Sequence, residues 1–199
     1  MWDWVNRGMR RERMTNTLHR RGSLEEMERD YVVKTFGSGG DMENAAAKRE
    51  AFKEIALKYN PISPRDDVHE FVFDNTDSVK EILTELKGAD LGLSVTVSGL
   101  VNRVVQCCQE AGIGLHTVEH SLGIMGRLDR LPSDNVLDIS SLCGHGMISN
   151  NIIHKVIDLV KRRRISPKEG AAYLSKPCTC GSFNAQRAEE ILERMRILG

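Results

Sequence analysis

The sequence has little of several features that would narrow its class. It has no net charge, because 28 Lys and Arg balance 28 Asp and Glu, so total charge gives no argument for a nucleic-acid or membrane-surface partner. No stretch approaches the roughly 18 consecutive apolar residues of a membrane span, and residues 1–14 lack the apolar run of a secretory signal. We therefore expect a cytoplasmic protein without a membrane partner, and only a local patch could bind nucleic acid.

Cysteine is also sparse. The chain has five cysteines, an odd number, which argues against a disulfide framework and favours thiol or metal chemistry. Cys107 and Cys108 are adjacent, so on a helix they point about 100° apart and cannot share one ligand. We expect them to pack as small apolar side chains. The 199 residues, 40% of them apolar and 28% charged, are typical of a folded, soluble protein.

Two segments precede the expected main domain. Residues 1–22 contain six arginines and few acids, which predicts a flexible basic arm that could dock on an acidic protein partner. Residues 23–61 predict a helical extension. Its first helix begins with a capping box at Ser23 and Glu26 and continues through Val32.

Residues 62–199 alternate between strand and helix patterns. In some segments apolar residues recur every three or four positions, which indicates a helix, and in others apolar and polar residues alternate, which indicates a strand. The predicted elements are a strand at 69–73, a helix at 76–86, a strand at 91–97 and a helix at 100–111. This order predicts an α/β (α+β) domain, with a small sheet of about three strands and helices packed on it.

The C-terminal segment 136–199 holds the most informative residues. A predicted strand at 136–139 leads into a C-x-H motif whose histidine is flanked by glycines, and a C-x-C motif lies between two predicted helices. Flanking glycines let the backbone curl around a bound atom. The two motifs offer three thiolates and one imidazole, a known zinc ligand set. The predicted metal ligands are Cys143, His145, Cys178 and Cys180.

The spacing leaves the metal undecided. In an extended chain, residues i and i+2 project about 6–7 Å apart, whereas tetrahedral zinc needs sulfurs about 3.8 Å apart. An extended C-x-C therefore suits an iron-sulfur cluster and a bent one suits zinc. Pro177 and Gly181 flank the motif and permit either conformation.

A second constellation is His116-Thr-Val-Glu119-His120. On a helix the two histidines share one face and can bind one metal, with Glu119 as a general base. In a strand they would lie about 13 Å apart and could not share an ion. The sequence leaves both conformations open.

The segments HTVEH, VLDISSLC and CG, in this order, resemble S-ribosylhomocysteine lyase, a metal-dependent enzyme that cleaves a thioether. The resemblance covers about 80 residues and implies that His116, His120 and Cys180 ligate zinc or ferrous iron. It also implies catalytic roles for Glu119, as proton carrier, and for Cys143, as a second acid/base thiol. His145, Cys178 and the N-terminal third have no counterpart in the family.

Three hypotheses for function follow. The first is a metal-binding protein that holds an iron-sulfur cluster or zinc in a redox, structural or accessory role. The second is the metal-dependent lyase. The third is a metal-free regulatory domain with a small-ligand pocket near Ser98-Gly99. The basic run Lys161–Arg164 ends a predicted helix and could hold a phosphate, although interaction with the helix C-terminus is the simpler explanation.

Overall fold

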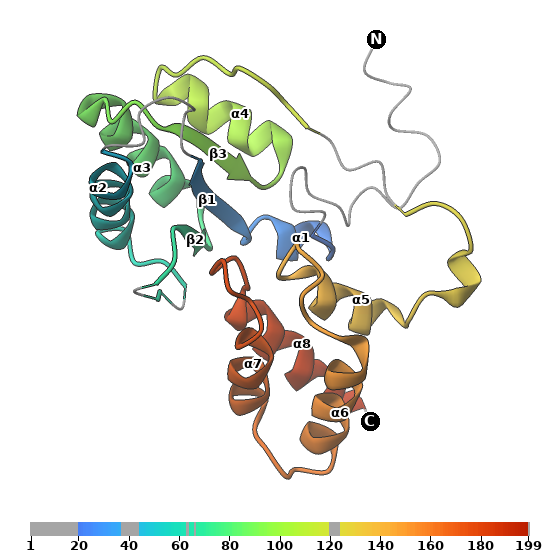
Figure 1. The fold of residues 1–199 in the computed structure, drawn as a ribbon. Coiled ribbons are helices and arrows are strands. Elements are labelled where there is room, and N and C mark those ends of the chain that lie inside the picture. Colours follow the sequence, from blue (N-terminus) through green and yellow to red (C-terminus); the bar gives the residue numbers. More distant parts are fainter. Residues whose placement is uncertain (1–19, 37–43, 63, 66, 120–123, 199) are drawn as a thin grey trace.

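The computed structural model describes residues 20–36, 44–62, 64–65, 67–119 and 124–198. These residues form eight α-helices and a three-stranded antiparallel sheet, which confirms the predicted α+β class (Figure 1). None of the helices in these ranges is both long and apolar enough to cross a lipid bilayer.

The sheet has the order β2-β1-β3, so its central strand comes from the N-terminal segment. The strands are β1 (Tyr31–Phe36), β2 (Glu70–Phe73) and β3 (Ser94–Ser98). Val33 of β1 lies opposite Phe71 on one side and Val97 on the other. The strands predicted at 69–73 and 91–97 are thus present, the second beginning later than expected.

The prediction of a helix from Ser23 through Val32 is wrong beyond its first turn. The capping box of Ser23 and Glu26 forms as predicted, but helix α1 covers only Leu24–Met27. The residues after it are aromatic and β-branched, which favours a strand, and both neighbouring strands are available to pair with them. The segment 23–61 is therefore not purely helical.

Three helices cover one face of the sheet: α2 (Ala45–Leu57), α3 (Thr76–Ala89) and α4 (Val101–Glu110). Their apolar sides share one core with Tyr31, Val33 and the other inward-facing strand residues, so residues before and after position 62 belong to the same cluster. Cys107 and Cys108 are buried in it, as expected for packing residues.

Four helices form a second core: α5 (Asp134–Ser141), α6 (Asn150–Lys161), α7 (Pro167–Ser175) and α8 (Ala185–Leu198). The strand predicted at 136–139 is wrong, because these residues lie in α5. Val136, Ile139 and Leu142 recur every three positions and are all buried, which is the spacing of a helix. A four-residue apolar run does not by itself separate strand from helix.

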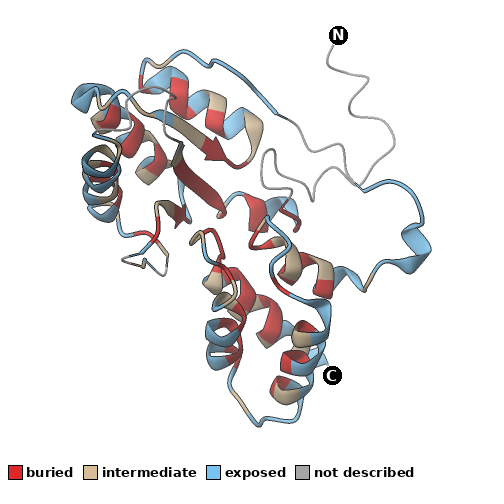
Figure 2. Ribbon diagram, in the orientation of Figure 1, coloured by how far each residue is buried: buried red, intermediate tan, exposed pale blue. Residues whose placement is uncertain are grey.

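A buried ionic network lies where the two groups of elements meet. Asp30 is completely buried and contacts Arg20, Arg187 and Asn184. Figure 2 shows buried positions in and beside α1, where these residues lie.

Residues 1–19 of the predicted basic arm lie outside the described part of the chain, but its last residues do not fit the prediction. Arg20 and Arg21 are buried and paired with acids, because Asp30 and Asp134 come within reach in the folded chain.

Candidate metal centre

Cys143, His145 and Cys180 form a group whose ligand atoms all lie within 4.8 Å of one another. The Sγ atom of Cys180 is 3.3 Å from Nδ1 of His145. Cys178 lies beside this group, with its Sγ 3.4 Å from that of Cys180. The structure therefore provides a group of three of the four predicted ligands that could hold a metal ion, with Cys178 in contact with one of them.

The site is built by two loops of the helical group. Cys143 and His145 follow α5, and the C-x-C motif forms the turn between α7 and α8. Gly144 and Gly146 have φ angles of 75° and 67°, in the left-handed region that glycine adopts without strain. These two glycines let the loop turn sharply on either side of the imidazole. Cys143 is buried, Cys180 half-buried and His145 exposed, so the site opens to solvent at the histidine.

Hydrogen bonds prepare one thiolate in this site. The pKa of Cys178 is lowered by hydrogen bonds from the thiols of Cys143 and Cys180, and the backbone N–H groups of Gly181 and Phe183 add to the effect. The pKa of Cys143 is raised correspondingly, because its proton bridges to its sulfur neighbours and because it is buried. Sulfur binds a metal in the thiolate form, so Cys178 can ligate directly, whereas Cys143 would have to lose its proton when an ion binds.

Polar groups around the thiols connect the site to the sheet. Arg65 donates a 2.7 Å hydrogen bond from Nη1 to the carbonyl of Cys178. Ser182 Oγ lies 3.1 Å from the Sγ of Cys180 and donates to the carboxylate of Glu70 on β2. Burial raises the pKa of Glu70 despite the hydrogen bond from Ser182, and the nearby Cys180 raises it further.

Sequence reasoning missed these supporting residues. Arg65 lies 113 positions before Cys178, and Glu70 lies 112 positions before Ser182. Ser182 lies only two positions after Cys180. Only Ser182 gave any signal, as a polar residue immediately after the C-x-C-G turn. The other two occupy positions typical of a loop and a strand end, so nothing in their local pattern indicated the site.

The histidine motif has a different environment. His116 and Glu119 are exposed, and residues 113–119 form neither a helix nor a strand. The helix that would place His116 and His120 on one face is thus not formed in the described residues of the motif, and His120 lies outside them. Neither His116 nor Glu119 belongs to the group of Cys143, His145 and Cys180. The lyase assignment and its residue roles stay a prediction.

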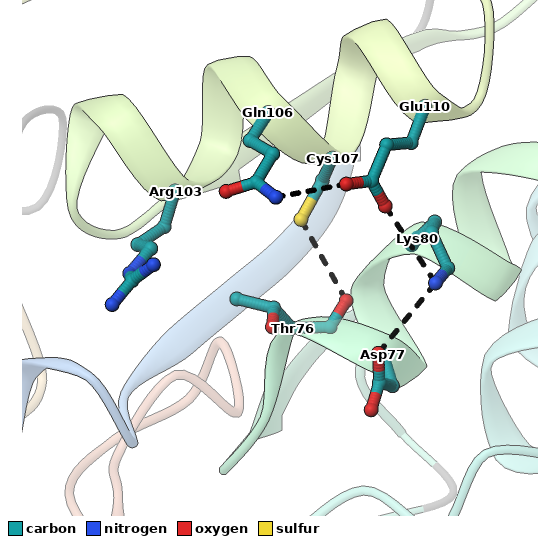
Figure 3. A pocket seen from close by; sticks show the side chains of 7 residues that line it. All are labelled: Thr76, Asp77, Lys80, Arg103, Gln106, Cys107 and Glu110. Atoms are coloured by element: carbon teal, nitrogen blue, oxygen red, sulfur yellow. Dashed lines mark hydrogen bonds and ion pairs between the residues drawn. The ribbon is translucent and has the colours of Figure 1, made fainter.

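A pocket of about 290 Å³ lies between α3 and α4 and is strongly polar (Figure 3). Its charged groups are paired: Lys80 lies 3.6 Å from both Asp77 and Glu110. The Cys107 thiol, whose pKa is raised by burial, donates to the Thr76 carbonyl at 3.6 Å.

The Ser98-Gly99 turn, where the sequence suggested a pocket, is tightly packed. A Cβ on Gly99 would lie 2.4 Å from the ring of Tyr31.

Comparison with known proteins gave no match: no protein-family model, no curated protein and no solved structure matches this chain.

Proposed function

We propose that the protein binds one zinc ion in tetrahedral coordination through Cys143, His145, Cys178 and Cys180. The spacing of the donor atoms carries this proposal. With Zn–S near 2.3 Å and Zn–N near 2.0 Å, a tetrahedral ion places two sulfurs about 3.8 Å apart and a sulfur and a nitrogen about 3.5 Å apart. The observed separations are 3.4 Å between the sulfurs of Cys178 and Cys180 and 3.3 Å from Cys180 to His145. A small outward adjustment would admit the ion.

The same spacing favours a single ion over an iron-sulfur cluster. In a cluster, the protein ligands bind different iron atoms that are themselves separated by bridging sulfides. The donors must then surround several atoms rather than one. Here the ligand atoms of Cys143, His145 and Cys180 all lie within 4.8 Å of each other, which supports a mononuclear centre. Three thiolates with one imidazole are a common set for structural zinc.

The ligand count also supports a structural role. Catalytic zinc keeps one coordination position for water or substrate, whereas four protein ligands fill a tetrahedral ion. The ion would join the loop after α5 to the turn between α7 and α8. The C-x-C turn and the adjacent Ser182 also contact Arg65 and Glu70. The ion would therefore link two loops of the helical group and stabilise the contact between this turn and the sheet.

Metal analysis of anaerobically purified protein tests the proposal. We expect a colourless protein with about one zinc per chain. We expect Cys178→Ser and Cys180→Ser to lose most of it, because each removes one of four ligands. Cys107→Ser is the matched control, since Cys107 is buried in the other core and should leave the metal content unchanged.

A cobalt titration of the wild type adds a measurement that does not depend on a variant folding. Co²⁺ in a tetrahedral site with thiolates gives intense visible and near-ultraviolet absorption. Visible absorption typical of an iron-sulfur cluster, together with bound sulfide, would show that the site holds a cluster and not zinc. Wild-type protein that binds neither zinc nor cobalt, or equal zinc loss in Cys107→Ser, would overturn the metal proposal altogether.

A further inference from the structure

The end of α6, the following turn and α7 form a surface of one charge sign. Residues 161–176 contain six cations and the single acid Glu169, in a chain with no net charge. All six cations are exposed. We call this set the basic corner: Lys161, Arg162, Arg163, Arg164, Lys168 and Lys176.

The cations of the basic corner are not neutralised locally. Within the described ranges, none of the six forms an ion pair with a carboxylate. Glu169, the one acid in the stretch, is engaged by Ser166 in the capping box of α7. Asp158, one turn earlier on α6, also forms no ion pair with Lys161 or Arg162. The surface therefore presents free positive charge to solvent.

Arg163 occupies a backbone position that normally selects glycine. Its φ is 55°, and the N–H groups of Arg163 and Arg164 donate to the carbonyls of Val160 and Leu159, both at 2.9 Å. This is a Schellman C-cap, in which a residue with a side chain is disfavoured at the left-handed position. The chain keeps an arginine there against the local backbone preference.

Helix stability does not account for the whole basic corner. Cations near a helix C-terminus interact favourably with the helix dipole, and this interaction explains the positions of Lys161 and Arg162 at the end of α6. The same effect is unfavourable for Lys168, which lies in the first turn of α7, at the positive end of that helix. The dipole of α6 can therefore explain its own terminal cations but not the position of Lys168.

We propose that the basic corner binds the phosphate backbone of a nucleic acid. Three consecutive arginines provide planar groups that match phosphate oxygens. The side chain of Tyr173 is 52% exposed, and the Lys176 ammonium lies 5.5 Å from the centre of its ring. An aromatic side chain that can stack on a base therefore lies among the cations.

A membrane surface fits this part of the protein less well, because an interfacial helix inserts an exposed apolar face. The apolar sides of α6 and α7 are used in the core, through Ile153, Val156 and Leu174.

Fluorescence anisotropy with labelled single-stranded DNA, duplex DNA and RNA tests the proposal, using the intact chain as purified. We expect micromolar binding at about 50 mM salt that weakens steeply as salt is raised. The triple variant Arg162→Gln/Arg163→Gly/Arg164→Gln should weaken binding about tenfold or more and reduce the salt slope by roughly three. The matched control Arg49→Gln/Arg127→Gln/Arg130→Gln removes three exposed arginines elsewhere and should leave binding unchanged.

Arg163→Gly alone separates binding from folding. Glycine fits the left-handed position better, so this variant should melt roughly 2–4 °C higher and yet bind nucleic acid more weakly. No binding of the wild type to any of the three probes, or equal weakening in the control triple, would overturn the proposal. Binding to vesicles of anionic lipid without binding to nucleic acid would assign the surface to a membrane instead. None of these results depends on the zinc proposal.

Discussion

Replacing Asp30 by asparagine should strongly destabilise the protein. Asp30 has no solvent exposure and accepts hydrogen bonds from two arginines and one asparagine. Arg20 donates twice, from Nε at 2.8 Å and from Nη2, Asn184 donates from Nδ2 at 3.0 Å, and Nη1 of Arg187 completes the set. This carboxylate ties the N-terminal segment to the beginning of α8. Asp30→Asn keeps the shape but removes the negative charge that both buried guanidinium groups contact, and Arg187 then retains the more distant Glu26 carboxylate at 3.9 Å.

The structure sets the size of the effect. Removing one partner of a buried ion pair costs about 3–5 kcal/mol, and both Arg20 and Arg187 are almost completely buried. Domains have a total free energy of unfolding of about 5–15 kcal/mol, so the variant should lose a large part of it. With a urea dependence of about 2 kcal/mol per molar, the unfolding midpoint should fall by more than about 1 M.

The effect should depend on pH in a defined direction. Burial alone would raise the pKa of Asp30, but Arg20 and Arg187 outweigh it and hold the pKa below its usual value. A depressed pKa stabilises the fold above the pKa of the unfolded state, near 3.9, and this contribution is lost as pH falls through the folded value. The difference between wild type and Asp30→Asn should therefore be full at pH 7 and narrow below about pH 4.

Urea unfolding at constant metal content measures this effect. Glu193→Gln is the matched control, because Glu193 pairs with Arg196 at the surface and such pairs contribute less than about 1 kcal/mol. If Asp30→Asn unfolds within about 1 kcal/mol of the wild type, the network does not stabilise the fold as its geometry indicates. A difference that grows on acidification would refute the sign of the pKa argument.

Three further predictions concern glycines. Gly181 has a φ of 93°, and a Cβ there would lie 2.7 Å from the Glu70 carbonyl oxygen. Gly181→Ala should therefore displace the C-x-C turn and lower the zinc affinity measured by competition with a chelator. An unchanged zinc affinity would contradict this prediction. Gly88→Ala meets no atom within 4 Å and should raise the free energy of unfolding by about 0.5 kcal/mol through helix propensity. Gly170→Ala would place its Cβ 3.0 Å from Leu192 and Val156 and should instead lower it by about 1–2 kcal/mol, so equal stabilisation by both would count against the packing argument.

The sequence alone determined the elements that have strong local signals. The helix α7 begins at the capping box of Ser166 and Glu169, and α8 begins after Asn184, whose side chain accepts the N–H of Arg187. The stripes of α3 and α4 were also visible, because their apolar spacing extends over several turns. The four candidate ligands were identifiable as a donor set, since three thiols and an imidazole are uncommon in two short loops.

Tertiary structure decided the rest. β1 looked like a helix because its strand partners lie far away in sequence, and α5 looked like a strand because its apolar run is too short to show a helical period. The bend of the C-x-C turn depends on Gly181 packing against β2, which no local pattern reveals. The donor set came from the sequence, but only the packing of four helices brings residues 143–145 next to 178–180, because contacts between distant segments follow from burial of a shared core.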